Sequence, residues 1–211
     1  MTIPFPHPKL RPPPVAGCCE LSGAAAAVAG FVVAQSSGPV LWVQDRLSVR
    51  EAGRPCFLGL RLPVLVMRLS HPRDVLAAAE EGLACRDLGA VVAEIHGNPA
   101  ALDFTASRRL AIRAEASGVR LWLIRHGAQP DNSAMRDRWR LTGLPSAAHP
   151  DDPAAPGDPR WRAELLRSRK ARPGEWVVRH DRTTDLLRFD PGFSDGALAE
   201  DAGANGRRGA G

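Results

Sequence analysis

Four short apolar runs, none of which alternates with polar residues, most strongly constrain how this chain can fold. They read PVLWVQ at 39–44, PVLVMRL at 63–69, AVVAEI at 90–95 and VRLWLIRH at 119–126. A strand that is apolar on both faces must be covered on both faces, which is typical of a parallel sheet between two layers of helices. The sequence therefore predicts an α/β fold with a mostly parallel sheet flanked by helices.

Helical patterns occupy the segments between these runs. HPRDVLAAAEEGLACRDLG has apolar residues at helical spacing and a proline that suits the first turn, and we expect this helix to end at Gly89. TASRRLAIRAEASG predicts a second helix, with Asp103 or Thr105 as its N-cap and Gly118 as its stop. The Ala-rich stretch after Gly23 predicts a third.

The pattern changes after the fourth apolar run. Residues 135–144, 160–170 and 174–181 alternate between apolar and polar side chains. Such alternation predicts strands with one face exposed to solvent. We therefore expect antiparallel strands at one edge of the sheet, the last two forming a C-terminal β-hairpin.

Composition divides the chain into one domain and two loose ends. Residues 1–14 are rich in proline and predict an extended arm. Residues 15–182 form the predicted domain, which a Pro-rich loop interrupts at 145–160. Residues 183–211 have too little apolar material for a core and predict a disordered tail.

Several classes of protein are disfavoured. No apolar run reaches the roughly 18 residues that a membrane span needs, and the N-terminus lacks the layout of a signal peptide, so we expect a cytoplasmic protein. Cys18, Cys19, Cys56 and Cys85 form no C-x-x-C pair, so neither a disulfide framework nor a metal site is predicted. The net charge is +5, and nearly all of the basic residues are arginines.

The stretch GAAAAVAG, from Gly23 to Gly30, stands between a predicted strand and a predicted helix, where many proteins bind nucleotide phosphates. Such a loop needs a second glycine, a lysine that reaches the β- and γ-phosphates and a hydroxyl that binds Mg²⁺. Here the second glycine position falls on Val28, and the lysine and hydroxyl positions fall on Ala29 and Gly30. The sequence therefore predicts a degenerate loop, with no catalytic residue, no cofactor and no bound metal.

The order of these elements resembles the core of RecA-type recombinase ATPases. In that comparison Asp45 falls near the position of the catalytic glutamate, and Ala93 and Glu94 stand where the Walker B strand would carry its metal-binding aspartate. We interpret Asp45 and Glu94 as vestigial. His126 ends the last apolar run, where ligands usually bind, although a hydrogen bond at a strand end explains it equally well.

A closer resemblance is to the ImuA family, RecA-like bacterial proteins of inducible mutagenesis cassettes. It covers roughly residues 15–182 and is carried by HPRDVLAAAEEGL, LDFTASRRLAIRAEASGV, RWRLTGLPS and RWRAELLRSRKARPGEW. The resemblance implies a non-enzymatic accessory protein of SOS-controlled translesion synthesis. Its partners would be ImuB, a Y-family-like protein, and an error-prone C-family DNA polymerase, with RecA as a further candidate and association with the nucleoid after DNA damage.

Basic and aromatic side chains of the second half are the candidates for contacts with DNA or a partner. Alternating arginines would give one charged face to phosphate, or else form the solvated outer face of an edge hairpin. The tryptophans suit an interface but equally a core. The candidates are Arg108, Arg109, Arg136, Arg138, Arg140, Arg167, Arg169, Arg172, Trp161 and Trp176.

Two other functions remain open from the sequence. A DNA-dependent ATPase or recombinase-like protein would need phosphate ligands that the degenerate loop lacks. A cell-division inhibitor that resembles SulA would have a related fold without ATPase chemistry.

Overall fold

A computed structural model describes residues 18–57, 62–128, 133–152, 154–184 and 186–189. These residues form one nine-stranded sheet in the order β3-β2-β4-β5-β1-β6-β7-β8-β9. The strands are β1 Cys18–Gly23, β2 Val40–Asp45, β3 Val64–Leu69, β4 Ala90–His96, β5 Arg120–His126, β6 Asp137–Leu144, β7 Arg160–Arg167, β8 Gly174–Asp181 and β9 Leu186–Phe189. The helices are α1 Ala25–Ala34, α2 Arg46–Glu51, α3 Pro72–Gly82 and α4 Phe104–Ser117.

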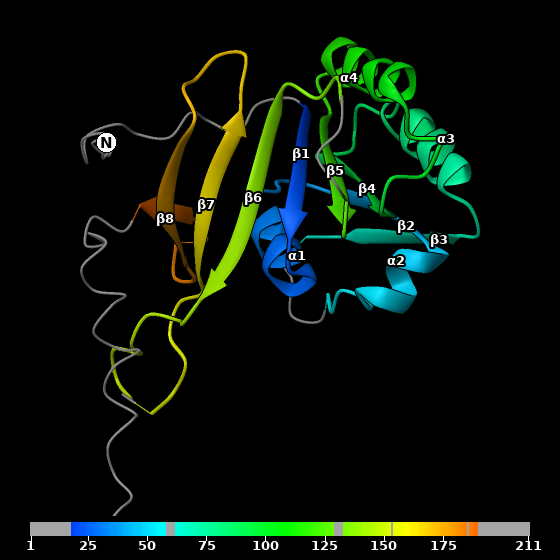
Figure 1. The fold of residues 1–211 in the computed structure, drawn as a ribbon. Helices are drawn as coiled ribbons and strands as arrows, with labels where there is room; N and C mark the ends of the chain where they lie inside the picture. The colour runs from blue at the N-terminus through cyan, green and yellow to red at the C-terminus, as the bar shows by residue number, and fades with distance from the viewer. Residues whose placement is uncertain (1–17, 58–61, 129–132, 153, 185, 190–211) are drawn as a thin grey trace, which may run out of the picture.

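The sheet is parallel from β3 to β6 and antiparallel from β6 to β9. Figure 1 shows α3 and α4 together over the parallel part, while β7 and β8 extend away from the helices. The predicted α/β class, with a mostly parallel sheet, flanking helices and antiparallel strands at the C-terminal end, is confirmed.

Two apolar cores, one on each face of the sheet, explain three of the four runs without alternation. In β5, Leu121 and Leu123 point into the core beneath α3 and α4, while Trp122 and Ile124 point into the core beneath α1. All four side chains are at most 1% exposed. Because both faces are covered, polar residues in the middle of this strand would each lose their hydration, which is why residues 121–124 are all apolar.

The prediction of two covered faces is wrong for the run at 63–69, because β3 is the edge strand and its Leu65 and Met67 are 55% and 40% exposed.

The helix boundaries agree with the sequence at most ends. Pro72 occupies the first turn of α3, Asp103 caps α4 by accepting the Ala106 N–H at 2.7 Å, and Gly118 ends α4 with a left-handed φ of 79°. The predicted end of α3 at Gly89 is wrong, since the helix ends at Gly82.

The position of Gly89 explains the early end of α3. The Gly89 N–H donates to the Pro39 carbonyl at 2.8 Å, and a Cβ on Gly89 would lie only 1.6 Å from the Ser37 carbonyl oxygen. The chain must therefore leave the helix early enough to bring this glycine against the start of β2. A side-chain pattern read along one segment does not reveal that contact.

Three further features differ from the expectations. β6 is not purely antiparallel, because it pairs parallel with β1 and antiparallel with β7. The short helix α2 was not predicted. The tail prediction is wrong for 186–189, where β9 pairs with β8 and Arg188 bonds Asp181 at 2.8 Å.

The remaining boundaries are only partly described. The β7–β8 hairpin is present as predicted. The described residues between 145 and 159 form no helix or strand apart from a bridge between Ala148 and Pro156. The arm at 1–14 and the tail beyond Phe189 lie outside the described residues. No helix in the described ranges has the length and apolar character to cross a membrane.

The four thiols differ in burial, and this difference makes a testable prediction. Cys18 and Cys19 of β1 have no exposed surface, and burial raises the pKa of both, whereas Cys56 and Cys85 are exposed. We expect iodoacetamide at pH 8 to label Cys56 and Cys85 in the folded protein and all four cysteines in denaturant, because only an accessible thiolate reacts. Peptide mass spectrometry measures this, and labelling of Cys18 at the rate of Cys56 would contradict the burial of β1.

Candidate functional site: the β1–α1 junction and its surroundings

The junction between β1 and α1 has no room for a phosphate-binding loop. Gly23 ends the strand, Ala24 is the N-cap, and the helix begins at Ala25. The lysine and hydroxyl positions of a phosphate-binding loop would fall on Ala29 and Gly30. Both residues, together with Val28, lie inside α1. Val28 is fully buried in the core. A loop whose backbone N–H groups wrap phosphates needs several residues outside the helix, and this junction has one.

Packing explains both glycines that frame the junction. Gly23 has a φ of +138°, and a Cβ built there would lie 2.0 Å from the carbonyl oxygen of Leu141 in β6. Gly30 lies against Trp161 of β7, whose ring carbon Cζ2 would be 3.2 Å from an added Cβ. Each glycine therefore allows a close approach within the protein rather than an approach by a ligand.

Asp45 has a structural partner. It is the N-cap of α2, and its Oδ1 accepts the Ser48 N–H at 2.6 Å. The side chain is buried, so the carboxylate is committed to the helix terminus rather than open to a substrate.

Glu94 lies at the centre of a buried polar cluster that the sequence reasoning did not assemble. Its Oε2 accepts the indole N–H of Trp42 at 2.6 Å, and its Oε1 lies 2.8 Å from Nε2 of His126. Glu94 is 2% exposed and His126 is 6% exposed. The three side chains come from β2, β4 and β5 and share the sheet face beneath α1. The signal available in the sequence was the two-residue period of strands, which points Trp42, Glu94 and His126 to the same face of neighbouring parallel strands.

A cavity of 330 Å³ adjoins this cluster. Its walls are α1, the segment 52–57 and the three strands. Among the described residues, no group of His, Cys, Asp and Glu side chains is arranged to hold a metal ion.

Most of the candidate arginines of α4 and β6 are paired with acids. Glu80 of α3 forms ion pairs with Arg109 at 2.6 Å and with Arg113 at 3.0 Å. Arg138 lies 3.5 Å from Glu20, and Arg140 lies 3.1 Å from Glu164 on the neighbouring strand. The structure thus favours the solvated, internally paired face over a phosphate-binding face for these positions.

Arg136 pairs with Glu115 of α4, and this hydrogen bond raises the pKa of Arg136 and lowers that of Glu115. The Glu115 pKa is lowered further by the charges of Arg169 and Lys170, so the β7–β8 turn lies near the end of α4.

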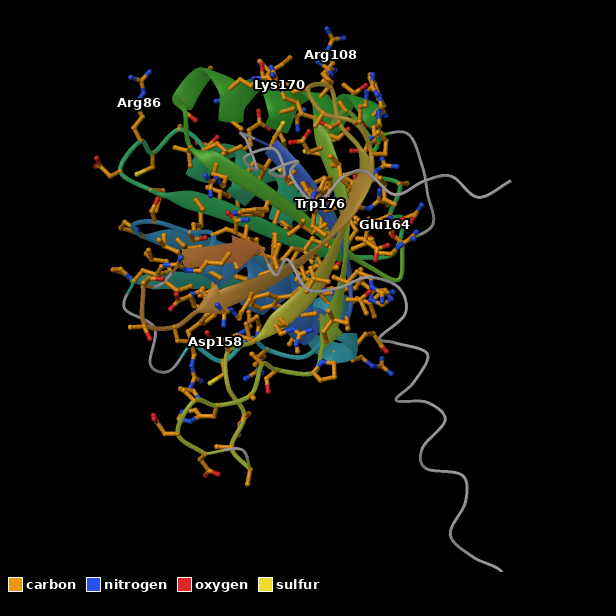
Figure 2. All side chains as sticks on the ribbon, turned by 90° about the vertical axis from the view of Figure 1, so that its left-hand side faces the viewer. Arg86, Arg108, Asp158, Glu164, Lys170 and Trp176 are labelled. Atoms are coloured by element: carbon orange, nitrogen blue, oxygen red, sulfur yellow. The ribbon has the colours of Figure 1, made fainter. Side chains whose placement is uncertain are left out.

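Four basic residues without an ion pair lie in and beside the β7–β8 turn. We define the basic turn as Arg167, Arg169, Lys170 and Arg172, all exposed. None of the four forms an ion pair with an acid in the described parts of the chain. Figure 2 shows Lys170 and the exposed Arg108 toward the same end of the molecule.

The two candidate tryptophans face the core. Trp161 is 5% exposed and packs edge-on against Phe31 with ring centroids 6.0 Å apart. Trp176 is partly buried, with its ring 5.8 Å from that of Trp139. Both therefore stabilise the packing of the antiparallel strands.

Comparison with known proteins decides the family. No protein-family model matches the chain. Two curated relatives do: Protein ImuA of Caulobacter vibrioides strain NA1000/CB15N and Protein ImuA of strain CB 15, each 34% identical over 191 residues, covering 78% of this chain and 75% of the relative. The chain belongs to the ImuA family. The recognition made from the sequence motifs is confirmed.

One substitution tests whether β6 packs tightly against the β1–α1 junction of this ImuA-family chain. Gly23→Ala combines a strained φ with a clash against the Leu141 carbonyl, so we expect it to lower the free energy of unfolding by more than about 2 kcal/mol. Gly118→Ala is the matched control, because its φ is also positive, at +79°, but its surroundings are open. We expect that control to cost about 1 kcal/mol.

Urea unfolding of the two variants measures the difference. Equal decreases in stability for Gly23→Ala and Gly118→Ala would show that β6 does not press on the junction.

Proposed function

We propose that this chain is a non-enzymatic accessory protein of DNA-damage-induced translesion synthesis, a RecA-like scaffold that organises other proteins without hydrolysing nucleotide. Membership of the ImuA family supports the role in an inducible mutagenesis cassette. The observation that carries the non-enzymatic part is the one-residue connection between β1 and α1.

The chemistry of phosphoryl transfer explains why this connection matters. A triphosphate needs backbone donors around it, a cation at its β- and γ-phosphates and a metal at the transferred group. The helix start here offers alanines, and its first turn contains no hydroxyl or basic side chain. Asp45 caps α2 and Glu94 is bonded within the sheet. Each of these two carboxylates, which could have held the metal, has another partner.

The proposed partners are an ImuB-like Y-family protein and an error-prone C-family DNA polymerase, with RecA as a further candidate. We expect a tagged chain from DNA-damaged cells to copurify with both polymerase-related proteins. Recovery of neither protein would contradict the scaffold role.

A substitution at Asp45 separates a scaffold from an enzyme. Asn caps helices as well as Asp, so Asp45→Asn should keep α2 and the fold intact. A scaffold with this variant should support damage-induced mutagenesis at the wild-type frequency in a strain lacking the gene. A decrease of about a hundredfold in a variant that remains folded would indicate that the Asp45 carboxylate takes part in catalysis.

We propose further that the basic turn contacts DNA phosphates. Its four cations form no ion pair with an acid of the described residues, so they can pair with phosphates without first breaking one. Replacing all four with Gln should weaken binding to a duplex oligonucleotide. It should also lower the salt dependence, by about 0.9 in the log–log slope for each phosphate that the variant no longer neutralises.

The matched control replaces Arg109 and Arg113 with Gln, which removes cations that Glu80 already pairs. We expect this control to bind like the wild type. An equally weak control, or a wild type that does not bind at low salt, would contradict the role of the basic turn.

A further inference from the structure

The cavity beside Glu94 has the lining of a binding site that the scaffold role does not use. Its volume, 330 Å³, is at the lower end of the range for small-ligand sites. One wall is the helix α1, with Ala25, Ala26 and Ala29 facing the space. The other walls are apolar or aromatic, apart from the Glu94–His126 pair and the rim around Arg54 and Cys56.

Glu94 brings a carboxylate into this apolar surrounding, and its ionisable neighbour at bonding distance is His126, 2.8 Å away. Its two bonds are to the Trp42 indole and the His126 ring, and the His126 tautomer with its proton on Nε2 donates to Oε1. No Lys or Arg of the described segments forms an ion pair with it. A carboxylate accepts about four hydrogen bonds, so acceptor capacity remains on both oxygens. Burial of a carboxylate is costly, and no Lys or Arg of the described segments offsets that cost, so a cationic ligand would lower it.

An aromatic surface beside the carboxylate defines the shape of the cation. The partly exposed Phe57 ring lines the cavity, and behind it lies the Trp42 ring, which has no exposed surface and a centroid 5.2 Å from that of Phe57. Planar guanidinium and amidinium groups stack on such rings and bond a carboxylate through two parallel N–H groups. The alanines of α1 would contact the apolar body that carries the group. An ammonium ion would use the carboxylate but not the aromatic surface.

We propose that this cavity binds a planar amidinium or guanidinium group on an apolar body, and that in the assembled complex this group is an arginine side chain of a partner protein. Arg54 stands at the rim with an exposed side chain, so the chain's own cation does not occupy the position. Only the assignment of this arginine to a partner protein rests on the proposed scaffold role. The binding itself is a property of the purified chain.

The test compares charged and neutral ligands of the same shape on the full chain. Benzamidine and benzamide differ in charge, as do N-acetyl-arginine amide and N-acetyl-citrulline amide. We expect each cation to bind at least about tenfold more tightly than its neutral counterpart, measured by titration with NMR. Binding of benzamidine but not of the arginine amide would assign the site to a small molecule and overturn the partner arginine.

Two variants tie the binding to this cavity. Glu94→Gln removes the charge and should abolish the preference for the cation, while Ala29→Phe should fill the space and abolish binding of all four ligands. Ala116→Phe, on the exposed surface of α4, is the matched control and should bind like the wild type. Circular dichroism verifies the fold of each variant.

Equal binding of benzamidine and benzamide, no binding at millimolar concentration, or binding that survives Ala29→Phe would overturn the proposal. Any of these results leaves the scaffold role intact, since copurification of partners does not depend on a ligand titration.

Discussion

The close contact between Gly23 and the Leu141 carbonyl is the constraint on which the rest of the molecule depends. It lets β6 join β1 directly, so the parallel sheet continues without a break into the antiparallel strands. The same contact closes the space at the end of β1, and the chain turns at once into α1. Gly30 then allows α1 to pack on Trp161, which secures the antiparallel strands to the helix layer. A single local geometry thus joins β1 to α1 through one residue and extends the sheet.

The polar groups around this junction are part of the architecture. Asp45 holds the start of α2, and Glu94 joins three strands through Trp42 and His126. The Glu94 carboxylate lines a mostly apolar cavity, and the proposed cationic ligand follows from that lining.

The strands and helices that depend on a local sequence pattern could be predicted from the sequence. β5 and α4 were predicted because burial on both faces, an Asp cap and a Gly stop leave direct traces in the sequence. The early end of α3 was not, because it depends on Gly89 reaching Ser37, and β9 was not, because four residues are too few to show a period. The pairing of Arg109 with Glu80, and of Arg140 with Glu164, joins elements distant in sequence, so spacing alone could not separate paired arginines from those of the basic turn.

We expect this domain to bind no triphosphate, and calorimetric titration with a non-hydrolysable ATP analogue and Mg²⁺ tests this most directly. We predict no saturable heat at micromolar to millimolar nucleotide, and no phosphate release from ATP. Stoichiometric binding that requires Mg²⁺ and disappears when Asp45 or Glu94 is neutralised would contradict it.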